Sequence, residues 1–149
     1  MRSMGDDDTN GSSYDAAGVR EARVGGRPAL SEAAGCVWAK SRRSDDGWLP
    51  LWRHLDDAAA VAGRLWDEWL PGSVRNRITG CLPGGDAAGR SLLVWLAGVH
   101  DIGKATPAFA MQVPELADRM RRRGLDMPPG DPECKRVPHG TAGQLMLRA

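Results

Sequence analysis

The chain has 149 residues, which is enough for one domain with a hydrophobic core and too few for two domains of ordinary size. Its 20 basic and 19 acidic side chains nearly cancel to a net charge of +1, so no overall field indicates a nucleic-acid or membrane partner, and any recognition must be local. Three widely spaced cysteines, Cys36, Cys81 and Cys134, argue against a disulfide framework or a zinc ribbon and favour a reducing cytoplasm.

The N-terminal segment is rich in glycine, serine and aspartate and nearly free of large apolar side chains. Such a composition buries too little surface to offset the entropy of ordering. We therefore expect residues 1–30 to form a disordered leader and residues 31–149 to form the folded domain.

The first regular element is expected between residues 49 and 70, where apolar side chains recur every three to four positions. This spacing predicts an amphipathic helix, and Pro71-Gly72 ends it. Residues 74–90 contain Pro83-Gly84-Gly85 and few large apolar side chains, which predicts a surface loop.

The most apolar run, residues 92–99, predicts a short and mostly buried helix with Ser91 as its cap. This run is far too short to cross a bilayer, so we expect no membrane association and a cytoplasmic location. Gly103 then marks a bend, and Thr106-Pro107 predicts the cap and first turn of another helix.

Toward the C-terminus, Pro114 is expected to restart the helix and Gly124 to end it. Residues 124–138 contain four prolines and cannot be regular, whereas residues 140–148 predict a last helix. No segment alternates with period two over a useful length, so the sequence predicts an all-α fold.

Two further features each allow two interpretations. The tryptophans suit base stacking, but we expect Trp66, Trp69 and Trp95 to lie in the core. The run "RMRRRG", residues 119–124, suits phosphate contact, but basic side chains at the C-terminal end of a helix also complement the helix dipole.

The three histidines of the chain lie in comparable settings. His54 lies in the first predicted helix, His100 and Asp101 follow the apolar helix, and His139 precedes the last one. If the helices converge, three imidazoles and a carboxylate suit a divalent cation such as Mn, Fe, Ni, Co or Zn. Taken singly, His54 suits a satisfied core residue better than a ligand, and His139 suits a surface loop. His100-Asp101 suits a pair at a helix C-terminus as well as a metal site.

The string "LAGVHDIGKATPAF", residues 96–109, resembles the HD signature of the CRISPR-associated HD nuclease family, the domain that opens the helicase-nuclease of type I systems. The block from Val37 to Leu70 resembles the opening of the same domain, and "HGTAGQLML" resembles its His-Gly helix. The resemblance runs from about Val37 to the C-terminus and implies a helical bundle of the HD type.

The resemblance also implies roles for individual residues. His54, His100, Asp101 and His139 would bind one or two divalent ions, drawn from Mn, Mg, Ni, Co and Fe. Asp101 and Lys104 would be catalytic, with Lys104 facing the bound phosphate. The implied substrate is single-stranded DNA, and the implied partner is the CRISPR surveillance complex. Because the sequence contains no helicase motif, a separate helicase chain is a further candidate partner.

Domains of this family continue past the His-Gly helix, where a further histidine pair and a late aspartate complete the metal site, whereas this sequence ends at Ala149. The resemblance therefore implies the N-terminal part of an HD nuclease domain, a bundle incomplete at its C-terminus, with apolar side chains of residues 142–147 exposed. Three activities stay open: a DNA nuclease, a non-catalytic remnant or docking module for the surveillance complex, and an HD phosphohydrolase acting on nucleotides.

Overall fold

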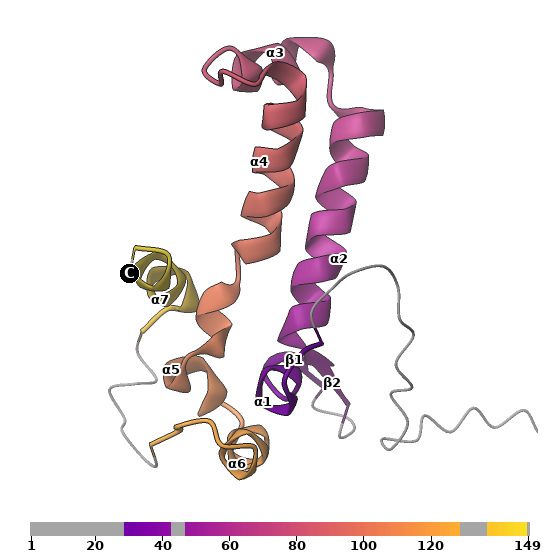
Figure 1. Cartoon of the computed structure of the whole chain (residues 1–149). Coiled ribbons are helices and arrows are strands. Elements are labelled where there is room, and N and C mark those ends of the chain that lie inside the picture. Colours follow the sequence, from indigo (N-terminus) through magenta and orange to yellow (C-terminus); the bar gives the residue numbers. More distant parts are fainter. Residues whose placement is uncertain (1–28, 43–46, 129–136, 149) are drawn as a thin grey trace, which may run out of the picture.

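The computed structural model of the chain describes residues 29–42, 47–128 and 137–148 (Figure 1). Two long antiparallel helices, α2 and α4, lie side by side; α3 caps one end of the pair, and the short elements gather at the other end. In chain order the elements are α1 (Glu32–Gly35), β1 (Trp38–Ser41), β2 (Trp48–Pro50), α2 (Leu51–Arg64), the π-helical turn η1 (Leu65–Trp69), α3 (Gly72–Thr79), α4 (Gly85–Val99), the 3-10 helix η2 (Ile102–Ala105), α5 (Pro107–Ala110), α6 (Pro114–Arg122) and α7 (His139–Met146).

The chain is mostly helical, which confirms the predicted all-α class, but it also contains a small sheet. Strands β1 and β2 pair antiparallel, with Trp38 opposite Pro50 and Ser41 opposite Trp48. The sequence pattern does not predict this pair, because strands of four and three residues are too short to show an alternation. The predicted helix from residue 49 consequently begins at Leu51, directly after β2.

The prediction of a loop over residues 74–90 is wrong, because this segment contains most of α3 and the first six residues of α4. Its small residues serve helix packing instead. A Cβ atom on Gly89 would lie 2.5 Å from the Trp66 ring, so glycine allows α4 to approach η1 closely. Ser91 therefore lies inside α4 and is not its cap.

The predicted tryptophan core is correct for Trp66 and wrong for Trp69 and Trp95. Trp66 is buried between η1 and α4, whereas Trp69 is exposed. The hydrogen bond from the Leu70 amide to the Leu65 carbonyl spans five residues and widens this turn, which changes the angular spacing of its side chains. Trp95 is exposed because α4 meets α2 through other positions, with Arg90 and Val94 beside Gly63 and Gly98 beside Ala59.

The hydrophobic core lies at the end of the helix pair where the short elements gather. Trp38 of β1 packs against Phe109 of α5, with the ring centroids 4.3 Å apart. The helix start at Pro107 and the restart at Pro114 are as predicted, and Gly124 follows α6 with a positive φ of 84°. The buried residues of this core are Cys36, Val37, Trp38, Ala39, Leu51, Phe109, Ala110, Ala117, Met120 and Met127.

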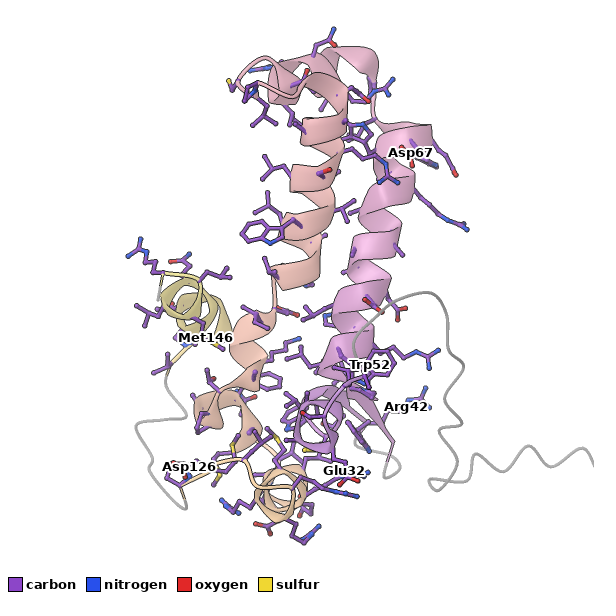
Figure 2. The ribbon with its side chains drawn as sticks, in the orientation of Figure 1. Glu32, Arg42, Trp52, Asp67, Asp126 and Met146 are labelled. Atoms are coloured by element: carbon purple, nitrogen blue, oxygen red, sulfur yellow. The ribbon has the colours of Figure 1, made fainter. Side chains whose placement is uncertain are left out.

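The last helix, α7, is attached at one side of this end. It buries Ala142 and Gly143, whereas Leu145, Met146 and Leu147 are exposed, as expected for this segment. In Figure 2, Met146 marks this helix. None of the helices in the described part of the chain has the length and apolar character that a bilayer crossing requires.

Several predictions fall largely outside the described residues. These are the disordered leader, of which residues 1–28 are not described, and the middle of the irregular segment, residues 129–136, which includes Cys134. Cys36 and Cys81, which are described, are both free thiols.

Candidate metal centre

Asp101 and Lys104 are brought together by the 3-10 helix η2. Asp101 is the residue before its first turn, and the Lys104 amide donates a hydrogen bond to the Asp101 carbonyl at 2.9 Å. Side chains three residues apart eclipse one another in a 3-10 helix. The Lys104 ammonium accordingly lies 2.7 Å from Asp101 Oδ2.

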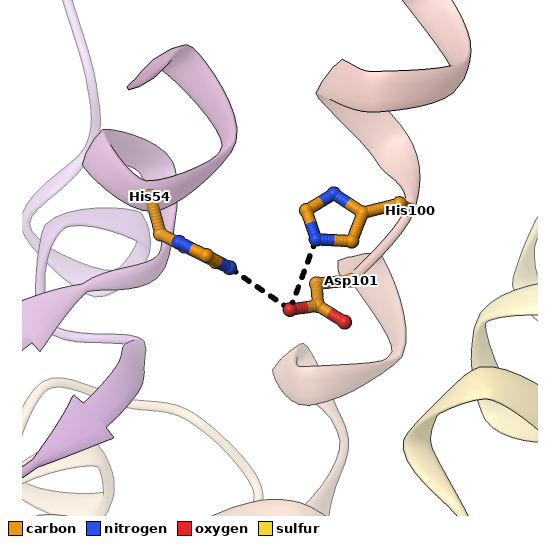
Figure 3. A group of neighbouring side chains, drawn as sticks. All are labelled: His54, His100 and Asp101. Atoms are coloured by element: carbon orange, nitrogen blue, oxygen red, sulfur yellow. Dashed lines mark hydrogen bonds and ion pairs between the residues drawn. The ribbon is translucent and has the colours of Figure 1, made fainter. Parts of the chain in front are cut away.

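Two histidines from the helix pair reach the same oxygen atom. His54 Nε2, from α2, lies 2.9 Å from Asp101 Oδ2, and His100 Nε2, from the end of α4, lies 3.2 Å from it. Figure 3 shows the two rings converging on this oxygen from opposite helices. The packing of α2 along α4 therefore positions both imidazoles.

A third histidine reaches the other oxygen because α7 docks very closely on η2. A Cβ atom on Gly103 would lie 1.9 Å from the His139 carbonyl oxygen and 2.5 Å from the Gly143 amide nitrogen, so only glycine fits there. This contact carries His139 Nε2 to 3.3 Å from Asp101 Oδ1. Gly103 was expected to mark a bend; its principal role is this close approach.

The tautomer of His100 is fixed by its own helix. His100 Nδ1 lies 2.7 Å from the Ala97 carbonyl oxygen, which can only accept, so Nδ1 carries a proton. In the neutral ring, Nε2 then presents a lone pair toward a carboxylate oxygen, and two acceptors facing each other need a proton or a cation between them. An imidazole held in this way by a backbone carbonyl is typical of a metal ligand.

Asp101 is ionised over the whole physiological range. Its side chain is only 12% exposed, and this burial raises the pKa of its carboxyl group. Hydrogen bonds from Lys104 and His54, together with the charges of Lys104 and His100, outweigh the burial and lower the pKa to about 2. A buried carboxylate that stays charged needs cationic partners.

The five residues singled out from the sequence thus meet around one carboxylate. They come from α2, the end of α4, η2 and α7, and His139 lies at the start of α7, not in a surface loop. His54, His100 and Asp101 offer ligand atoms within 4.8 Å of one another. Imidazole nitrogen and carboxylate oxygen form a donor set that fits a first-row divalent cation.

Sequence reasoning missed two supporting residues. Gly103 admits α7, and Phe109 lies between Lys104 and His139, with its ring centroid 5.4 Å from Lys104 Nζ and 5.8 Å from the His139 ring. Both residues lie inside the string that carries the family resemblance, residues 96–109, but the sequence alone assigned neither of them a role at the site.

The arginine-rich end of α6 is engaged in structural contacts. The Arg119 guanidinium stacks on Trp48 at 4.7 Å from the ring centroid. Arg121 contacts Asp118 and donates to the Met127 carbonyl, while Arg123 contacts Glu32. These partners favour the structural interpretation of this run over phosphate contact.

Comparison with known proteins gives one consistent result. Residues 38–149 match the family model described as "Cas3, HD domain". The chain is 33% identical over 128 residues to the CRISPR-associated nuclease/helicase Cas3 of Streptococcus thermophilus, covering 74% of this chain and 14% of that protein. It is 34% identical over 122 residues to the CRISPR-associated endonuclease/helicase Cas3 of Thermus thermophilus, covering 80% of this chain and 12% of that protein. No solved structure matches the chain.

Proposed function

The chain belongs to the Cas3 HD-domain family, and from this premise we propose that it is a metal-dependent phosphodiesterase that cuts single-stranded DNA in CRISPR antiviral defence. The observation that carries the proposal is the convergence of three imidazoles on the buried carboxylate of Asp101. The chain spans about one-seventh of the length of the curated relatives, so their DNA cleavage and their partners are proposals for it.

The donor set supports the metal dependence. We assign His54, His100 and Asp101 Oδ2 as ligands of one divalent ion, with His139 and Asp101 Oδ1 as donors to the same ion or a second one. Mixed nitrogen and oxygen donors suit Mn, Ni, Co and Fe, with Mg as a further candidate. When bound, a divalent cation lowers the pKa of its water ligand and polarises a phosphoryl oxygen.

The protein side chains supply binding and charge. Of the four ligands, His100 and His139 are the most exposed, so a DNA phosphate reaches the carboxylate from their side. The positive charge of Lys104, which contacts Asp101 Oδ2, offsets negative charge that develops on the phosphate. In this proposal Asp101 and Lys104 are the catalytic groups.

The test is cleavage of an end-labelled single-stranded oligonucleotide by the purified chain, with Mn²⁺ or Ni²⁺ and with EDTA. We expect cleavage that requires the metal and is lost in Asp101→Asn. The matched control is Asp67→Asn, because Asp67 is a carboxylate of the same helix pair far from the site, and this variant should cleave like the wild type. Metal-dependent hydrolysis of deoxynucleoside triphosphates with intact DNA would instead assign a nucleotide phosphohydrolase.

The partners follow from the same proposal. We propose that the chain acts in the cytoplasm with the CRISPR surveillance complex. Co-purification with the complex, combined with no metal binding and no cleavage, would instead assign a non-catalytic docking module.

A further inference from the structure

Lys104 holds an unusual position for a group that is expected to face substrate. Its side chain is 10% exposed, and its ammonium has two described partners, Asp101 Oδ2 at 2.7 Å and the face of the Phe109 ring at 5.4 Å. The contact with Asp101 is shorter than any of the three histidine contacts to that carboxylate. A buried ammonium needs such partners, because removal from water without them is costly.

The oxygen that Lys104 contacts is also the oxygen of the candidate metal centre. His54 and His100 both approach Asp101 Oδ2, and these three residues form the cluster able to hold a cation. A carboxylate oxygen has two lone pairs, and one of them is directed to the ammonium. A divalent cation on the same oxygen would be repelled by that positive charge in surroundings that screen it poorly.

We propose that Lys104 is the internal counter-ion of Asp101, which occupies Oδ2 in the metal-free protein and lowers the affinity of the site for divalent cations. This inference rests on the metal centre of the proposed function. Lys104 acts on the metal through Asp101 and is in this respect a positioning residue. Cation binding weakens the ion pair and frees the ammonium, so that its charge becomes available to a substrate phosphate only when the metal is present.

Phe109 explains how the ammonium stays within reach after it leaves the carboxylate. The ring attracts a cation over its face, and Phe109 is itself fixed against Trp38 in the core. Lys104 therefore retains one favourable partner in both states, and the change requires a side-chain movement rather than a backbone movement.

The experiment compares Mn²⁺ affinity, by calorimetry, and the melting temperature of EDTA-treated protein with and without Mn²⁺. The variants are Lys104→Met, which removes the charge, Lys104→Gln, which keeps a donor, and Lys104→Arg, which keeps the charge. Lys40→Met is the matched control, because Lys40 is an exposed lysine on β1.

We expect Lys104→Met and Lys104→Gln to bind Mn²⁺ about tenfold more tightly than the wild type or better, because a repelling charge is gone. Their metal-free melting temperatures should fall, because Asp101 loses its closest partner, and Mn²⁺ should raise them more than it raises that of the wild type. Lys104→Arg and Lys40→Met should keep the wild-type affinity. A lost phosphate contact or a general packing defect would not increase metal affinity.

Unchanged or weaker Mn²⁺ binding by the neutral variants overturns the role of Lys104 while leaving the metal centre intact. If Lys104→Met does not fold, Lys104→Gln decides by the same criterion. The absence of any Mn²⁺ binding by the wild type overturns the metal centre itself, so the two failures are distinguishable.

Discussion

Two polar clusters join the paired helices α2–η1 and α4, one near each end, and they differ in burial and in chemistry. Near α3, Asp67 of η1 accepts two hydrogen bonds from Arg90 of α4, at 2.9 and 2.8 Å, and both side chains are about half exposed, at 49% and 46%. At the opposite end, Asp101 is 12% exposed and has four nitrogen partners. Figure 2 labels Asp67 near one end of the pair and Trp52 near the other.

The difference separates an ion pair that links two helices from the candidate metal centre. Water screens the exposed pair, and one guanidinium satisfies one carboxylate, so the contact is complete in itself. Imidazole nitrogens of three histidines lie within 3.3 Å of the buried carboxylate, and imidazole and carboxylate together suit a divalent cation. The second cluster offers the nitrogen and oxygen donors that a divalent cation prefers, whereas the guanidinium of the first cluster offers no ligand atom.

Gly103→Ala should have the largest effect, because it breaks the second cluster by undocking α7. The new Cβ would overlap the His139 carbonyl and the Gly143 amide, and backbone atoms cannot move aside as a flexible side chain does. We expect a loss of about 3 kcal/mol or more in unfolding free energy, measured by urea titration. Gly140→Ala is the control, because Gly140 lies in α7 itself and no atom of another element lies near its Cβ position. This variant should be at least as stable as the wild type.

His54→Ala tests whether the imidazoles bind a metal or merely support Asp101. His54 makes the shortest imidazole contact to the carboxylate, so we expect a loss of Mn²⁺ affinity of about 100-fold or more. Calorimetric titration measures it. Asp67→Asn, at the opposite cluster, should bind Mn²⁺ like the wild type, and equal losses in both variants would contradict the distinction between the clusters.

Acid should remove the contribution of Asp101 to stability in the metal-free protein. Its pKa is lowered to about 2 in the folded state, against about 3.9 in an unfolded chain. A lowered carboxyl pKa stabilises the fold above the unfolded value, and this stabilisation is lost as pH falls from about 4 to about 2. The difference in unfolding free energy between wild type and Asp101→Asn should therefore shrink from about pH 5 to about pH 3, in EDTA. A constant difference would contradict the assigned ion pair.

Arg90→Ala should have the smallest effect. Solvent screening reduces what the Asp67 pair contributes, so the melting temperature should change less than in Gly103→Ala, and Mn²⁺ affinity should not change. Thermal unfolding and calorimetry check both values. A fall in Mn²⁺ affinity would mean that the two ends of the helix pair are coupled.

Much of the site was predictable because it follows short-range sequence signals. The apolar run into His100-Asp101 locates the C-terminal half of α4, and the prolines locate the starts of α5 and α6, from local chemistry alone. The convergence of His54 and His139 on Asp101 is different, because their separation in sequence is large. The residues alone allowed a shared site only if the helices converged, and the family resemblance supplied that condition.

The errors arise where small residues carry the packing. The segment before Ser91 has the composition of a loop, but its glycine and alanine residues allow close helix contact, as Gly89 does against Trp66. The same effect hid the role of Gly103. The exposure of Trp69 and Trp95 depends on which faces of the helices pack together, and the hydrophobicity of a side chain does not determine which face that is.

The most direct test of the central claim is calorimetric titration of Mn²⁺ into EDTA-treated wild type, Asp101→Asn and Asp67→Asn under one set of conditions. The account predicts saturable binding to the wild type and to Asp67→Asn, and none to Asp101→Asn. Equal binding by all three proteins, or none by the wild type, would contradict a metal centre built on Asp101.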